Sequence, residues 1–276
     1  MRAKPILYET HVHTPLCGHA VGEPTLYAEQ AGRSGLAGIV FTCHNPTPNG
    51  YGSDWRMAEH QFTLYTNMVA AARREHEGSV DVRLGLECDY LPEFESWLQC
   101  QIASAPLEYV LGSIHAQYPE YLARFGSPED PQFFRTYFDH LALAAESRLF
   151  DCLAHPDIVK IVAPERWSFE TYLPWIADCL DRVAATGVAI EFNTSGTLKA
   201  PFETYPGPGF LQEAVARGIP VVIGSDAHMP TRVGTGFENA LVTLAGLGAK
   251  DVSYFAHRSR VDVSISEALA SLRGLG

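Results

Sequence analysis

The stretch HVHTPLCGHA, residues 11–20, places His11, His13 and His19 within nine positions near the start of the chain, with Cys17 between them. Histidines this dense are typical of a metal site. A single His-x-His pair is weak evidence, however, because it also arises by chance in a chain that has 11 histidines. The interpretation of the stretch therefore depends on where the other histidines lie.

Short apolar runs alternate with helical patterns on both sides of this stretch. The runs are rich in Val, Ile, Leu and Tyr, and several are bounded by Gly or Pro, as buried strands are. We expect seven strands, at 6–13, 37–44, 82–91, 109–116, 151–157, 188–195 and 220–228. Between them, apolar residues recur at helical spacing, most clearly over 134–145 and 173–184.

Strands that alternate with helices form a parallel sheet. The simplest closed form is an α/β fold, a distorted (β/α)7 barrel of the TIM type, and a doubly wound open sheet is the competing architecture. The sequence has no long linker, internal repeat or low-complexity segment. We therefore expect one barrel domain over residues 1–276, with 229–276 as a C-terminal segment that caps or flanks the barrel.

Six of the seven predicted strands end in side chains that can bind a metal. These side chains are His11 and His13, His44, Glu87, His115, His155, and Asp226 with His228. In a parallel barrel all strand ends emerge on one face, where such enzymes have their active sites. His19 follows the first strand closely enough to fold back over the same face, so we predict a metal site at the C-terminal ends of the strands.

Nine potential ligands of His, Glu and Asp type are too many for one ion, because a structural zinc site takes four ligands and is usually rich in cysteine. The set suits two to three divalent transition-metal ions, with a carboxylate such as Glu87 as a bridge. Zn, Fe and Mn all accept imidazole and carboxylate, so the ligands do not select the metal.

Some of these residues also have ordinary structural interpretations. A lone strand histidine such as His115 or His155 is more often a hydrogen-bonded core residue, and it is the joint placement at strand ends that favours a site. We predict surface or packing roles for the four other histidines, His60, His76, His140 and His257. Of the cysteines near the ligands, Cys43 and Cys88 should face away from the site by strand alternation, and Cys17 is interpreted as a small buried residue.

The net charge of −12 argues against nucleic acid or an anionic membrane as partners, but it allows a small anionic substrate held by metal ions. The N-terminus lacks a secretory apolar run, and no window approaches the roughly 20 apolar residues of a membrane span. Six scattered cysteines without a C-x-x-C pair fit reduced thiols, so we expect a cytoplasmic protein. The oligomeric state is not predicted.

The motifs HVHTPLCGH, TCHNP, GLECDYLP, LGSIHA, AHPDIVK, EFNTSG and GSDAH occur in this order along nearly the whole chain. Together they resemble the PHP (polymerase and histidinol phosphatase) superfamily. GLECDYLP, EFNTSG, the segment YPGPGFLQEAVARGIPVVIGSDAH and the chain length are most similar to its monofunctional histidinol-phosphatase branch. The resemblance implies a distorted seven-stranded barrel with a trinuclear metal centre.

The resemblance also implies a division of the ligands among three ions. One ion would take His11, His13, Glu87 and Asp226. A second would share Glu87 and add His115 and His155, and a third would be held by His19, His44 and His228. We expect Glu87 and Asp226 to be the catalytic carboxylates, with Glu87 bridging ions and Asp226 orienting, or accepting a proton from, the nucleophile.

The expected activity is that of a metal-dependent phosphomonoesterase, and L-histidinol phosphate, in histidine biosynthesis, is the first choice of substrate. A nucleotide or another small phosphate ester is the alternative substrate, since a fold hosts many activities. The alternative that is not an enzyme is a non-catalytic PHP module, which would serve as an interaction or stability domain. Such modules lose metal ligands, whereas all nine predicted ligands are present here.

The loops that select the substrate depart from the family pattern. Relatives follow NTSG with an arginine-containing segment, but here NTSGTLKAPFETYP has Lys199 and no arginine, and AQYPEYLARFGSPED after His115 also differs. We expect Lys199 and Arg232 to bind the substrate phosphate and Glu203 to bind the ammonium group. The alternative is that all three are solvated loop charges.

Overall fold

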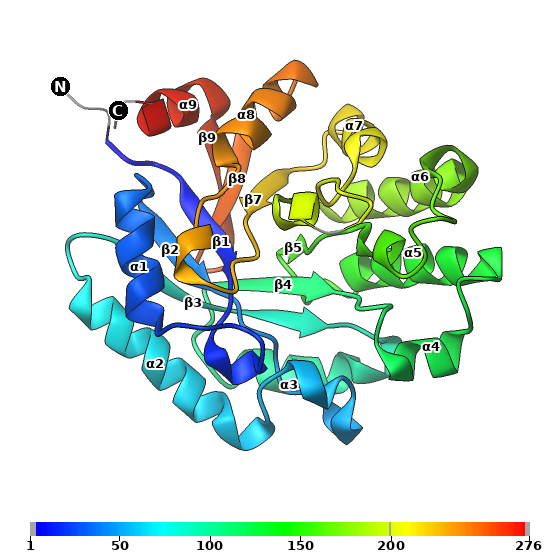
Figure 1. Ribbon diagram of the computed structural model, residues 1–276, viewed down its shortest axis with the longest axis horizontal. Helices are drawn as coiled ribbons and strands as arrows, with labels where there is room; N and C mark the ends of the chain where they lie inside the picture. Colours follow the sequence, from blue (N-terminus) through cyan, green and yellow to red (C-terminus); the bar gives the residue numbers. More distant parts are fainter. Residues whose placement is uncertain (1–3, 199, 274–276) are drawn as a thin grey trace.

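The computed structural model describes residues 4–198 and 200–273, and its centre is one curved sheet (Figure 1). The strands are β1 (Tyr8–Val12), β2 (Gly38–Phe41), β3 (Asp81–Asp89), β4 (Tyr109–Ser113), β5 (Cys152–Leu153), β6 (Ala189–Asn193), β7 (Val221–Gly224), β8 (Asp251–Ala256) and β9 (Ser259–Ser264). They pair in chain order, parallel from β1 to β8, and β9 is antiparallel to β8. The prediction of an α/β fold with parallel strands is confirmed.

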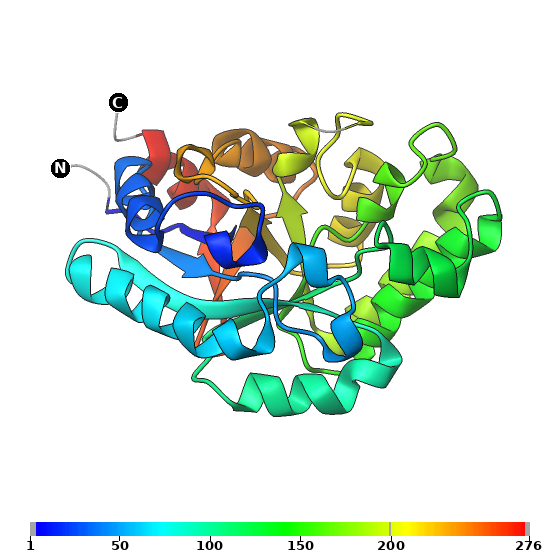
Figure 2. The ribbon, with the colours of Figure 1, turned by 60° about the horizontal axis from the view of Figure 1, so that its bottom comes forward.

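Helices surround this sheet on its outer side (Figures 1 and 2). They are α1 (Pro24–Arg33), α2 (Phe62–Glu75), α3 (Glu95–Ala103), α4 (Pro119–Phe125), α5 (Pro131–Glu146), α6 (Phe169–Thr186), α7 (Pro208–Ala216), α8 (Phe237–Gly246) and α9 (Ile265–Arg273). Among the described residues, no helix is both long and apolar enough to cross a membrane.

The helix α5 shows how the sequence specifies these elements. Asp130 caps it by accepting a hydrogen bond from the Gln132 amide at 2.9 Å, and Pro131 occupies its first turn. The apolar face predicted between residues 134 and 145 is buried against the sheet and α6. The helix α6 ends at Thr186 and is followed by Gly187, whose left-handed φ of 78° is a conformation that glycine adopts at little cost.

The two edges of the parallel sheet meet at its C-terminal end. The amide of His13 donates to the Ala227 carbonyl at 3.0 Å, and the Ala227 amide donates to the His11 carbonyl at 3.0 Å. At the other end, β8 pairs with β7 and its Tyr254 stacks on Tyr8 of β1, with ring centres 4.3 Å apart. The arrangement is consistent with a distorted barrel and not with a doubly wound open sheet.

The C-terminal hairpin, β8 and β9, supplies part of the sheet interior. Phe255 stacks on Tyr109 of β4 with ring centres 5.4 Å apart. In the turn, Arg258 pairs with buried Asp151 at 2.5 Å and donates to the Leu149 carbonyl at 2.7 Å. The sequence analysis expected this segment to cap or flank the barrel and did not predict these two strands.

All seven predicted strands are present, but several end earlier than expected. The strand β2 ends three residues before His44, and β5 ends two residues before His155. Beyond β2 the ladder is interrupted, and His44 still forms an isolated parallel bridge with Glu87. After β5 and β7 the chain leaves the ladder. His155 and Asp226 have φ values of 27° and 49°, a strained region for residues other than glycine.

Candidate metal centre

The nine predicted ligands lie together at the C-terminal face of the sheet. The nine residues lie on β1 and β3 and on the segments that follow β1, β2, β4, β5 and β7. Side-chain contacts of 2.8–3.7 Å link neighbouring members. Several triads have ligand atoms within 4.8 Å of one another, which is close enough to surround an ion. Their assignment as ligands remains a prediction.

The first group surrounds one oxygen of Asp226. The Nε2 atom of His13 lies 3.1 Å from Asp226 Oδ1, and the Nε2 atom of His11 lies 3.7 Å from it. The same two nitrogens lie 3.6 Å and 3.3 Å from Oε2 of Glu87. Two imidazoles and two carboxylates thus converge on one point.

The second group lies on the other side of Glu87. Its Oε1 atom is 2.9 Å from His155 Nε2 and 3.5 Å from His115 Nε2. Because the two carboxylate oxygens face different groups, Glu87 has the geometry of a bridging ligand. The side chain is completely buried, so it has no access to bulk water.

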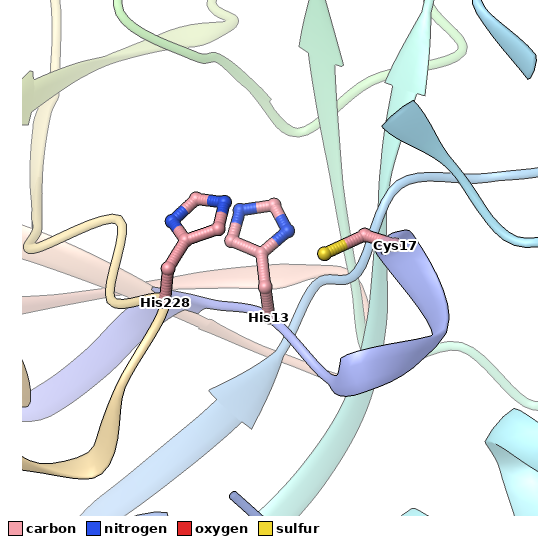
Figure 3. Close-up of side chains that lie close together, drawn as sticks. All are labelled: His13, Cys17 and His228. Atoms are coloured by element: carbon pink, nitrogen blue, oxygen red, sulfur yellow. The ribbon is translucent and has the colours of Figure 1, made fainter. Parts of the chain in front are cut away.

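The third group is nearer the surface. The Nε2 atoms of His19 and His228 are 2.8 Å apart, and His44 completes the triad. Figure 3 shows His13 between His228 and Cys17, with one ring nitrogen directed towards the Cys17 sulfur. Cys17 is buried and belongs to a further triad with these two histidines, so it lies nearer the site than the sequence suggested.

Several buried polar atoms of these groups have no hydrogen-bond partner among the described residues. They are His11 Nε2, both ring nitrogens of His13, His44 Nδ1, Glu87 Oε2 and His155 Nδ1. Buried polar atoms are normally paired, because an unpaired one costs about 1–3 kcal/mol. Four of these atoms converge, because His11 Nε2, His13 Nε2 and His44 Nδ1 lie 3.3, 3.6 and 2.9 Å from Glu87 Oε2. The donor set therefore fits resident metal ions.

The charges of the site favour cations as well. Burial alone would raise the pKa of Glu87, but the nearby His44 and His11 hold it well below its usual range. Burial likewise opposes ionisation of Asp226, whose pKa is held low by His11 and His228. Burial lowers the pKa of His44 to about 4. The carboxylates are thus held ionised, which is the state that binds metal. Although burial opposes it, the contact with the Asp226 carboxylate raises the pKa of His13 to about 9, so metal binding at that group would release a proton.

A second layer of carboxylates orients the histidines, and sequence analysis missed it. Glu191 of β6 lies 2.7 Å from His11 Nδ1, and Asp89 lies 2.7 Å from His115 Nδ1. Buried Arg56 pairs with Asp89 in turn. Glu191 lies on the one strand for which no ligand was predicted. The only signal was a carboxylate inside a buried strand, which is rarely left there without a partner.

A cavity of about 740 Å³ opens above these groups. His44, His115, His155 and Asp226 are among its lining residues. Tyr118 stacks on the His115 ring at 5.0 Å, and Trp55 meets the His19 ring edge-on at 5.5 Å. The cavity thus joins the polar groups of the site to aromatic walls.

The three predicted substrate-binding residues have different outcomes. Arg232 lines the cavity. Glu203 pairs with buried Lys160 at 3.4 Å and is not among the described residues that line the cavity. Lys199 lies outside the described residues.

The four histidines outside the site fit packing or surface roles. His140 is buried in the helical layer, and the Tyr121 hydroxyl lies 2.9 Å from its Nδ1. His76 contacts Thr25, while His60 and His257 are exposed. The cysteines Cys43 and Cys88 pack in the core.

Known proteins resemble this chain in sequence and in fold. A model of the PHP domain matches residues 9–195. The chain belongs to the PHP family. It is 38% identical to a probable histidinol-phosphatase of Deinococcus radiodurans, covering 91% of this chain and 97% of that protein. It is 27% identical to histidinol-phosphatase of Bacillus subtilis, covering 83% and 96%.

The fold of this PHP protein is also that of a solved relative. Histidinol phosphate phosphatase from Lactococcus lactis, in a structure with zinc, L-histidinol and phosphate, superimposes with a TM-score of 0.77 over 92% of this chain and 98% of that one. The identity is 19%, so this likeness establishes the shared fold alone.

Proposed function

We propose that this PHP protein is a metal-dependent phosphomonoesterase that hydrolyses L-histidinol phosphate to L-histidinol and phosphate. The observation that carries the proposal is the position of Glu87, whose two oxygens face different histidine groups beneath a cavity of about 740 Å³. The 38% identity to a probable histidinol-phosphatase across 91% of the chain supports the choice of substrate.

The proposal includes two to three divalent ions, Zn, Fe or Mn, at the three groups. One ion would be held by His11, His13, Glu87 and Asp226. Another would share Glu87 and add His115 and His155, and a third would be held by His19, His44 and His228. When bound, such ions activate a water molecule for attack on phosphorus and neutralise the charge on the phosphoryl oxygens.

The protein groups would position the reacting atoms. Asp226 directs Oδ1 at His11 and His13, while its Oδ2 accepts a hydrogen bond from the Ser195 hydroxyl at 3.3 Å. That second oxygen can orient the attacking water or accept its proton. Glu87, which is completely buried and turns its two oxygens to different groups, would be shared by two of the ions.

The substrate phosphate also needs a cationic donor beyond the metals. Arg232 is on a short turn, Pro230–Arg232, that follows β7 and lines the cavity. An arginine there suits the outer phosphoryl oxygens, which it can bind through two parallel hydrogen bonds. The contribution of Lys199 is proposed from the sequence alone. A small phosphorylated molecule as the partner, without nucleic acid or membrane, and a cytoplasmic location complete the proposal.

Phosphate release by metal-loaded protein tests the proposal. L-histidinol phosphate should be turned over with the highest kcat/KM in a panel that includes p-nitrophenyl phosphate and a nucleoside monophosphate. If the nucleoside monophosphate has the highest kcat/KM instead, the substrate assignment is wrong but the phosphomonoesterase reaction stands. If protein with a full metal complement hydrolyses none of these esters, the proposal that it is a phosphomonoesterase is wrong.

A further inference from the structure

The cavity has two carboxylates among its described lining residues, Asp54 and Asp226. Asp226 faces His11 and His13 and belongs to the metal groups. Asp54 belongs to none of these groups. It lies on the short turn Ser53–Trp55 and its side chain is exposed. It is therefore the carboxylate that remains for a ligand in the cavity.

The turn that carries Asp54 is anchored at both ends. Gly52 and Arg56 are buried, whereas Ser53, Asp54 and Trp55 between them are exposed. Arg56 donates from Nε to the Gly52 carbonyl at 3.1 Å, and the Gly52 amide donates to Glu120 at 3.2 Å. A turn anchored this way has a fixed backbone, which lowers the entropic cost of binding a ligand through its side chains.

The anchor also connects the turn to the metal site. Besides Gly52, Arg56 binds the Asn45 carbonyl at 2.9 Å and pairs with Asp89. Asp89 in turn contacts His115 Nδ1 at 2.7 Å. The position of Asp54 is thus set by the same network that orients one of the predicted ligands.

The neighbourhood of Asp54 is aromatic. Trp55 is 46% exposed although it is large and apolar, and it lines the cavity with Tyr118. Arg232, the arginine among the described lining residues, comes from a different element. A cavity whose described lining offers an arginine, a carboxylate outside the metal groups and aromatic walls suits a ligand that carries a phosphate, an ammonium group and a flat ring.

We propose that Asp54 binds the ammonium group of the substrate and thereby selects phosphate esters of aromatic amino alcohols. This inference rests on the proposed phosphatase function and adds a residue that determines specificity. It differs from the expectation for Glu203, because the Glu203 carboxylate pairs with Lys160 whereas Asp54 lines the cavity.

The test compares L-histidinol phosphate with 3-(imidazol-4-yl)propyl phosphate, which lacks only the amine. In the metal-loaded Asp54→Asn variant, kcat/KM for L-histidinol phosphate should fall about 10-fold, mainly through KM, because a charge-assisted hydrogen bond is lost. The amine-free ester should change less than about twofold. Asp54→Glu, which keeps the charge, should retain most of the preference for the amine.

Glu59→Gln, an exposed change five residues further along, is the matched control, and metal content is measured for each variant. The role of Asp54 would be wrong if Asp54→Asn lowered kcat/KM equally for both esters. It would also be wrong if Glu203→Gln, and not Asp54→Asn, lost the preference for the ester with the amine. Binding of L-histidinol and of its amine-free alcohol, measured by calorimetry, separates this inference from the proposed function. Wild-type protein that binds both alcohols equally would also overturn it, whatever its activity.

Discussion

Glu87 is the residue that the first and second ligand groups share. It is fully buried, and its Oε1 and Oε2 atoms lie 2.9 Å from His155 and 3.3 Å from His11. Glu87→Ala should remove metal from two groups at once and lower kcat/KM by more than about 100-fold, since even changes behind the ligands cost 10–100-fold. His228→Ala should mainly empty the third group. Elemental analysis and kinetics on both variants test these expected losses of metal. A Glu87→Ala protein that keeps its full metal content would contradict the shared role of Glu87.

His140 lies away from the metal groups, and we expect it to affect the stability of the fold and not the activity. Burial lowers its pKa from 6.5 to about 4. A histidine with a depressed folded-state pKa stabilises the fold above pH 6.5 and loses that contribution as the pH falls towards 4. Between pH 7.5 and 5, wild type should lose up to about 2 kcal/mol of unfolding free energy more than His140→Gln, measured in urea.

The activity of His140→Gln at pH 7.5 should stay within a few-fold of wild type. Equal losses of stability in the two proteins would mean that His140 is not held neutral by burial.

Much of the candidate site could be predicted from residue types because its predicted ligands recur at strand ends, where a parallel sheet brings distant residues together. Glu191, Asp89 and Arg56 could not be found in this way. They contact other side chains through hydrogen bonds and ion pairs, and such contacts produce no recognisable spacing of residues in the sequence. Asp54 was missed for a related reason: a short turn gives no periodic signal, and its place at the cavity depends on the Arg56 anchor.

At the scale of elements, the strands were predictable and their ends were not. The run DCLAHPD predicts a strand over 151–157, but the ladder of β5 spans Cys152–Leu153 because His155 turns inward with a φ of 27°. The strands β8 and β9 were not predicted, although RVDVSI within the run VSYFAHRSRVDVSI alternates polar and apolar residues. Their place in the sheet depends on their mutual pairing and on contacts with distant residues, which the local pattern does not reveal.

The hairpin of β8 and β9 should stabilise the fold without taking part in catalysis. Arg258→Ala removes an ion pair with Asp151 and a bond to the Leu149 carbonyl. Because Asp151 stays buried, the change should cost about 1–3 kcal/mol of unfolding free energy. Metal content and kcat/KM should remain within twofold. A variant of normal stability that loses metal would place the hairpin in the site instead.

At the scale of the whole molecule, the core and the metal groups are separable. The apolar cores within the sheet and beneath the helices are built from residues other than the nine predicted ligands. Chelation should therefore abolish turnover while far-ultraviolet circular dichroism stays close to that of the metal-loaded protein. The melting temperature should fall, because ions that bind only the folded state stabilise it. Unfolding on chelation would show that the metals hold the fold together.

The most direct test of the account is a metal titration of the apo-protein, with phosphate release from L-histidinol phosphate followed at each step. Turnover should be absent without metal and should rise until two to three ions are bound per chain by elemental analysis. Saturation at one ion, or undiminished turnover in the chelated protein, would contradict a multinuclear metal-dependent phosphatase.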